Sequence, residues 1–144
     1  MKGFGVQQDQ TKGIQLYQQA SNKGKANATN KLASCYLRGT GIAQDKMKAC
    51  ELYQQSADGG YCHAFCNLGV CHENGDGVKQ DAKKAVELYQ RGVELGDAGS
   101  MKHLGLCYMK GNGVEMDEKR GKELLQKAAD LGNKRAKDII AKMT

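Results

Sequence analysis

The feature that most constrains this chain of 144 residues is an internal repeat with a period of 36 residues. Four glycines mark the period: Gly3, Gly39, Gly75 and Gly111. A second glycine follows each of them two positions later, and an aspartate follows each of them six positions later. We therefore predict a single repeat array over 1–144. It comprises a half repeat at 3–25, whole repeats at 26–61, 62–97 and 98–133, and a C-terminal capping helix at 134–144.

Each repeat carries signals that start, sustain and stop two helices. The aspartates can cap helices by accepting hydrogen bonds from unpaired backbone N–H groups. Apolar residues at three- and four-residue steps, such as Ala85, Leu88 and Tyr89, form a buried stripe. Because the chain has no proline, glycine must end the helices. The sequence predicts an all-α chain without strands, with helices at 9–23, 26–38, 45–59, 62–74, 81–95, 98–110, 117–131 and 134–143.

The segment LGLCYMKGNGVEMD at 104–117 resembles the signature of the Sel1-like repeat family, and 32–45 and 68–81 are similar. The few departures are Ala33, Ile42, His72 and Gly121. The resemblance covers nearly the whole chain and implies an α-solenoid, a right-handed superhelix of 36-residue helix-turn-helix units related to tetratricopeptide repeats. It also implies a concave groove lined by the first helices, and a scaffold or adaptor that binds a protein or peptide partner and is not an enzyme.

Polar and basic residues of the first helices differ from repeat to repeat, as a recognition surface should. We predict that the partner binds in this concave groove at Asn27, Asn30, Lys31, Ser34, Arg38, His63, Cys66, Asn67, Val70, Lys102, His103, Leu106 and Lys110. Amide and ammonium groups can hold a peptide backbone and a carboxylate, so an acidic or carboxylate-terminated partner is expected. A merely solvated face is the alternative.

Charge and hydropathy bear on the other possible partners. The net charge of +6 admits nucleic-acid binding as an alternative, but acidic residues are interleaved with the basic ones along the whole chain, so no nucleic acid is expected. No apolar run approaches the ~18 residues of a membrane span, and the first 24 residues lack the apolar core of a signal peptide, so no membrane contact is expected. We expect a cytoplasmic protein, with a secreted, periplasmic or lumenal parent protein as the alternative.

The sequence contains no strong motif for catalysis, nucleotide binding or metal binding. The Gly-x-Gly pairs lack a preceding strand and a third glycine, so they indicate interhelix turns, and we predict no cofactor and no catalytic residue. Cys62, His63 and Cys66 could share one ion, with Cys50 as an additional ligand, but structural zinc normally has four ligands. We therefore predict no metal site. The alternative is a metal-binding, ligand-binding or enzymatic role, as in some cysteine-rich repeat proteins.

Three of the six cysteines, Cys35, Cys71 and Cys107, share one repeat position beside the apolar stripe. We expect them to be buried, reduced and inert. The resemblance to the cysteine-rich branch of the family would imply a disulfide within each repeat. Those positions are held here by Ala57 and Phe65 and by Val93 and Met101. A reducing compartment without disulfides is the simpler expectation.

The start of the chain, Met1-Lys2-Gly3, repeats Met109-Lys110-Gly111. This suggests the hypothesis that the chain is a piece of a longer array whose preceding first helix is missing. The opening half repeat would then be uncapped. Its helix would show the next pair an apolar face that includes Ile14, Leu16 and Tyr17, with nothing packed on the other side, which would allow self-association.

Overall fold

A computed structural model describes residues 2–143, with side chains described from Asp9 onward. These residues form eight α-helices and no strand: α1 (Lys2–Asn22), α2 (Ala26–Arg38), α3 (Lys46–Asp58), α4 (Cys62–Asn74), α5 (Ala82–Glu94), α6 (Ala98–Lys110), α7 (Glu118–Asp130) and α8 (Lys134–Met143). The prediction of an all-α fold is confirmed.

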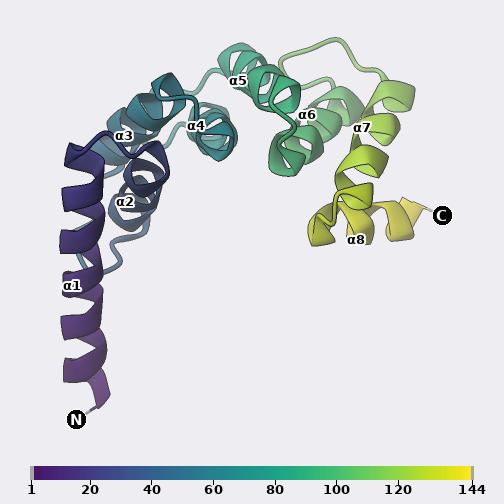
Figure 1. Ribbon diagram of the computed structural model, residues 1–144. Helices are drawn as coiled ribbons and strands as arrows, with labels where there is room; N and C mark the ends of the chain where they lie inside the picture. Colours follow the sequence, from purple (N-terminus) through teal and green to yellow (C-terminus); the bar gives the residue numbers. More distant parts are fainter. Residues whose placement is uncertain (1, 144) are drawn as a thin grey trace.

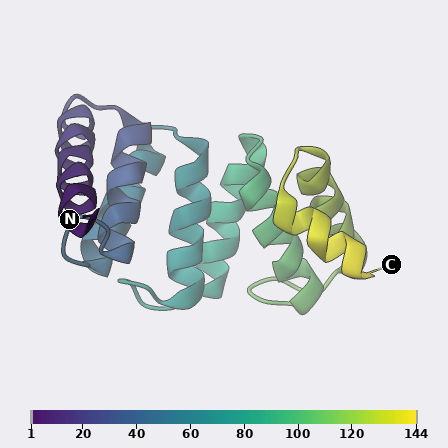
Figure 2. The same ribbon diagram turned by 90° about the horizontal axis from the view of Figure 1, so that it is seen from below.

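Consecutive helices pack against one another, and the stack curves into an arch (Figure 1). Helices α3, α5 and α7 form the outer layer of the arch. Helices α2, α4, α6 and α8 form the inner layer, and in Figure 2 they follow one another across the inner side. The inner side, which we call the concave face, is therefore built from the first helices of successive repeats.

The aspartate and glycine signals act as predicted. Asp45, Asp81 and Asp117 each accept a hydrogen bond from the backbone N–H three residues later, at 3.0–3.1 Å, and so cap α3, α5 and α7. Gly75 ends α4 in the left-handed conformation, with φ of 77°. Gly77 has φ of 73°, and a Cβ there would lie 2.2 Å from the Lys46 carbonyl oxygen. The second glycine of the pair is thus needed for close packing against the preceding repeat.

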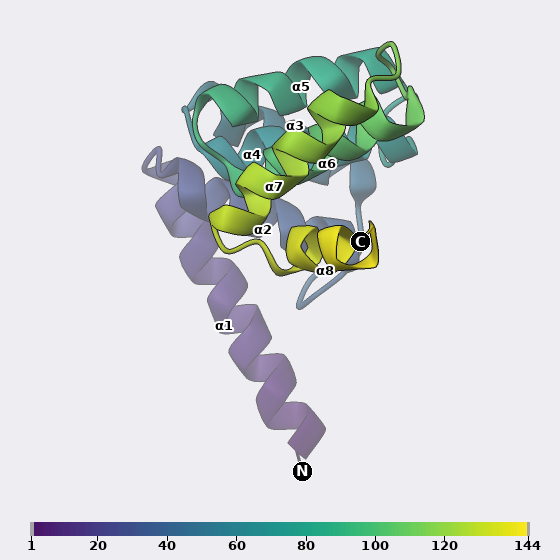
Figure 3. The same ribbon diagram turned by 90° about the vertical axis from the view of Figure 1, so that its right-hand side faces the viewer.

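The first helix differs from the prediction, because α1 begins at Lys2 and not near residue 9. In the next repeat, the turn after α2 is held by Gly39 and Asp45, whose N–H groups donate to the carbonyls of Cys35 and Tyr36. At the start of the chain, Gly3 and Asp9 lie within the continuous helix α1, so the equivalent turn does not form there. Figure 3 shows α1 extending beyond the rest of the stack.

The core consists of three clusters of buried residues along the array and is formed mainly by the predicted apolar stripes. Its largest fully buried apolar side chains come from four different helices: Leu32, Leu68, Tyr89 and Leu125. Ile14 and Tyr17 pack against the first core cluster, whereas Leu16 is 57% exposed. None of the described helices is long and apolar enough to cross a membrane.

The cysteine prediction holds in two of three positions. Cys71 and Cys107 are buried, whereas Cys35 is only partly buried. Cys35 lies beside Thr40, Tyr17 and Ile14, in an open hollow between α1 and α2, so its sulfur is less enclosed. All six cysteines are free thiols.

Candidate functional site

The residues predicted to bind a partner lie on α2, α4 and α6, the helices of the concave face. Their exposure varies. Exposed members are Asn27, Lys31, Arg38, His63 and Lys110; partly buried members are Ser34, Cys66, Asn67, Val70, His103 and Leu106; buried members are Asn30 and Lys102. The structure brings some of these side chains together and uses others for packing.

An amide pair joins α2 to α4. The Asn67 amide Nδ2 donates to the Asn30 carbonyl Oδ1 at 3.0 Å, and Asn30 is only 8% exposed. The other amide groups of this pair, Asn67 Oδ1 and Asn30 Nδ2, have no hydrogen-bond partner among residues 9–143. An extended peptide could hydrogen-bond to both of them, since one is an acceptor and the other a donor.

A cationic group lies further along the same face, on α6 and α8. Lys102 is only 7% exposed, and its burial together with the charge of nearby Arg135 lowers its pKa. Within residues 9–143, neither side chain forms an ion pair with an acid. Two cations held close together without a counter-ion attract anionic groups.

His103 contributes a neutral ring to this group. It stacks on the Tyr89 ring, with centroids 5.2 Å apart and planes at 13°. Burial, reinforced by the charges of Lys102 and Arg135, lowers the pKa of His103 to about 4. His103 is therefore uncharged at neutral pH, and the positive charge resides on Lys102 and Arg135.

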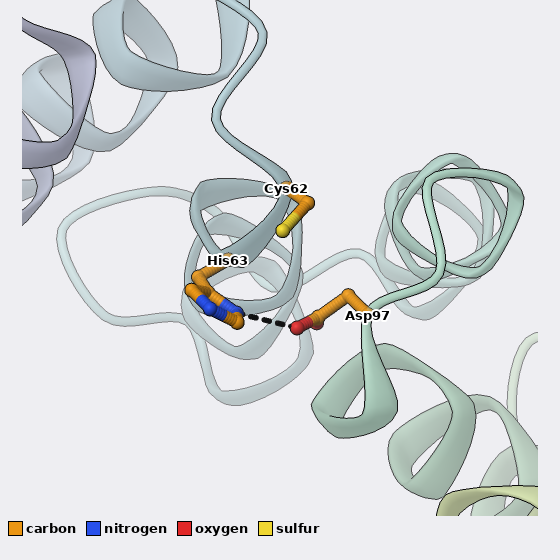
Figure 4. A group of neighbouring side chains, drawn as sticks. All are labelled: Cys62, His63 and Asp97. Carbon is orange, nitrogen blue, oxygen red and sulfur yellow. Dashed lines mark hydrogen bonds and ion pairs between the residues drawn. The ribbon is translucent and has the colours of Figure 1, made fainter. Parts of the chain in front are cut away.

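A third group lies where the start of α4 meets the start of α6 (Figure 4). His63 Nδ1 and Asp97 Oδ1 are 2.5 Å apart, and Asp97 is 3% exposed. The other oxygen of Asp97, Oδ2, accepts from the backbone N–H of Ser100 at 2.9 Å and from its hydroxyl at 2.7 Å, which caps α6. The sulfur of Cys62 lies within 4.8 Å of the ligand atoms of His63 and Asp97.

Sequence reasoning missed Asp97. It occupies the repeat position directly before a first helix, where Asn133 caps α8 by accepting from the N–H of Ala136 at 2.9 Å. The capping position that Asp97 shares with Asn133 could have identified Asp97 from the sequence.

Several predicted residues have structural roles. The Ser34 hydroxyl hydrogen-bonds to the Tyr53 hydroxyl at 2.8 Å. Val70 and Leu106 pack against the core clusters. Cys66 lies against α6, near the backbone of Gly99, and burial with the nearby charge of Asp97 raises the pKa of its thiol to about 12. These four side chains support the concave face more than they offer groups to a ligand.

Comparison with known proteins places the fold. Among solved structures, a Sel1 repeat protein from Oxalobacter formigenes is 29% identical with a TM-score of 0.83, covering 85% of this chain and 49% of that one. A protective antigen of uropathogenic Escherichia coli is 31% identical with a TM-score of 0.80, covering 88% of this chain and 27% of that one. This chain thus spans about half of the first protein and about a quarter of the second.

Cysteine-rich protein B of Helicobacter pylori is 28% identical with a TM-score of 0.71, covering 93% of this chain and 96% of that one. A search of curated proteins found no match. The family model described as Sel1 repeat matches four segments that together span most of the sequence: 1–25, 26–61, 63–97 and 98–133. The chain belongs to the Sel1 repeat family.

Proposed function

We propose that this protein is an interaction module that binds an extended segment of a partner protein along its concave face, with a carboxylate of that segment seated at Lys102 and Arg135. Sel1 repeat proteins generally serve as scaffolds for protein–protein interaction and are typically not enzymes. The single observation that carries the finer proposal is Lys102, a lysine 7% exposed that has no acidic partner among the described residues.

The surroundings of Lys102 explain why this side chain indicates an anionic ligand. Burial of most of the Lys102 side chain lowers the pKa of its ammonium group, and a second cation, Arg135, lowers it further. A carboxylate that reached Lys102 would relieve both the lost solvation and the repulsion from Arg135. Charge-assisted hydrogen bonds of this kind contribute about 1.5–3 kcal/mol.

The amide pair supplies a second point of contact for the same segment. Neighbouring helices lie about 8–10 Å apart, so the path from Asn30 and Asn67 to Lys102 crosses roughly 20 Å. An extended chain of about six residues spans that distance. One peptide could therefore hydrogen-bond to the amide pair through its backbone while its carboxylate contacts Lys102.

Fluorescence polarisation with labelled octapeptide pools tests the proposal. One pool has a free C-terminal carboxylate, a second is amidated at that end, and a third is amidated with internal Asp and Glu. We expect saturable binding of at least one carboxylate-bearing pool and weaker binding of an amidated pool without acids. The comparison of the first and third pools separates a chain terminus from acidic side chains as the source of the carboxylate.

Lys102→Met retains the aliphatic stem of the side chain but removes the charge, so it should weaken binding by about 10- to 100-fold. Lys83→Met is the matched control, because Lys83 is exposed on α5 in the outer layer, and it should bind like the unmodified protein. Equal binding of all pools, or equal affinity of both variants, would contradict the proposal. Affinity for single-stranded RNA that falls steeply with salt concentration would favour a nucleic-acid partner instead.

A further inference from the structure

We propose that Cys62, His63 and Asp97 form a binding site for one divalent zinc-like ion at the junction of the second and third repeats. This goes beyond the proposed peptide binding and revises the sequence-based prediction of no metal site. The carrying observation is geometric: a thiol, an imidazole and a carboxylate place their ligand atoms within 4.8 Å of one another. Figure 4 shows these groups turned toward the same space between α4 and α6.

The ligand types suit zinc. Thiolate, imidazole and carboxylate are its usual protein ligands, with bonds of about 2.0–2.3 Å. Ligand atoms around a tetrahedral zinc ion therefore lie roughly 3.3–3.8 Å apart. The Cys62 sulfur would move inward by about 1 Å, and His63 Nδ1 and Asp97 Oδ1, which are 2.5 Å apart without the ion, would separate by about 1 Å. The fourth coordination position would face solvent at His63, whose side chain is 58% exposed, and could be filled by water.

The surrounding contacts hold two of the ligands in place. While one oxygen of Asp97 faces His63, the other is fixed by two hydrogen bonds from Ser100. The His63 ring makes an edge contact with Tyr61, with centroids 5.2 Å apart. Such outer contacts orient metal ligands and strengthen binding. The carboxylate therefore needs no rearrangement of its helix cap to bind an ion.

The repeats provide an internal comparison. At the junction before this one, the three equivalent positions hold Ala26, Asn27 and Tyr61; at the junction after it, they hold Ala98, Gly99 and Asn133. Neither set could bind a metal through thiolate and imidazole. The first and third junctions therefore form without a cysteine, a histidine and an aspartate at these positions. Packing of the helices alone does not explain why the middle junction has all three.

Binding would follow ordinary ligand chemistry. The Cys62 thiol loses its proton to solvent as the sulfur binds the ion. The hydrogen between His63 Nδ1 and Asp97 Oδ1 moves to Nε2 or to solvent, and both atoms then donate electron pairs to the ion. No oxidant or reductant is involved.

Titration of the full, untagged and reduced chain with Co²⁺ tests the site, since Co²⁺ reports thiolate coordination by a charge-transfer band in the near ultraviolet. We expect one Co²⁺ per chain with this band, and its displacement by Zn²⁺. Three variants each introduce a residue used at another junction: Cys62→Ala, His63→Asn and Asp97→Asn. The first should abolish the band, and the other two should weaken binding at least about 10-fold.

Cys35→Ala is the matched control, because Cys35 is also a partly buried thiol but lies on α2, and it should retain both the band and the affinity. Thermal unfolding followed by circular dichroism gives a second readout. Zn²⁺ should raise the Tm of the unmodified chain and of Cys35→Ala, but not that of Cys62→Ala. Absence of the band at one equivalent of Co²⁺, or a band that survives Cys62→Ala, would overturn the proposal.

Discussion

Replacing Leu68 by alanine tests whether the repeats are energetically coupled. Leu68 on α4 is 1% exposed and belongs to a core cluster shared by helices α2 to α5. The substitution removes three carbon atoms, which corresponds to about 2.4 kcal/mol at about 0.8 kcal/mol per buried CH₂. A residual cavity of roughly 50 Å³ would add about 1.2 kcal/mol. We therefore expect the free energy of unfolding to fall by about 3–4 kcal/mol.

Urea unfolding followed by circular dichroism measures this loss, and hydrogen exchange locates it. Because the cluster joins both neighbouring repeats, protection should fall in α2 and α3 and also in α5. Leu16→Ala is the matched control: it removes the same atoms from a side chain that is 57% exposed, and should cost less than about 0.5 kcal/mol. A loss below about 1 kcal/mol for Leu68→Ala, or exchange changes confined to α4, would refute the coupling.

Three further results are expected. The pKa of His103 is about 4, below its usual 6.5, so the unfolded chain binds more protons between these values. Stability should fall by at most about 3 kcal/mol as pH drops from about 6.5 to 4, and NMR titration of an unshifted His103 would contradict this. Burial raises the pKa of Cys71 and Cys107, so a thiol reagent should label them only at the rate of unfolding; fast labelling would be inconsistent. Tyr89→Phe removes a 2.8 Å hydrogen bond to Glu73 and should cost about 1–2 kcal/mol in urea unfolding; no cost would mean that the bond does not stabilise the fold.

The helices could be predicted because their signals are local. Each capping aspartate and each terminating glycine acts within a few residues of its own helix, as at Asp81 and Gly75. The start of α1 could not be predicted in the same way. The glycine and aspartate signals that form the turn at Gly39 recur at Gly3, but there they lie inside the continuous helix α1.

The candidate site was only partly predictable, because its groups form between repeats. The repeat pattern indicated Lys102 as a concave-face residue, but its proximity to Arg135 depends on how α8 packs beside α6. In the same way, a helical projection of α4 includes Cys62 and His63 but cannot include Asp97, which precedes α6. Aligning the positions before each first helix would have indicated Asp97, since Asn133 has the same capping role.

The central claim is that the concave face binds the partner, and chemical-shift mapping of the ¹⁵N-labelled protein tests it most directly. The probe is the carboxylate-bearing octapeptide pool that shows saturable polarisation. We predict that the shifted amides cluster around Asn30, Asn67, Lys102 and His103 on α2, α4 and α6, with α8 responding at Arg135. Shifts that instead cluster on α3, α5 and α7, the outer layer of the arch, would contradict the account.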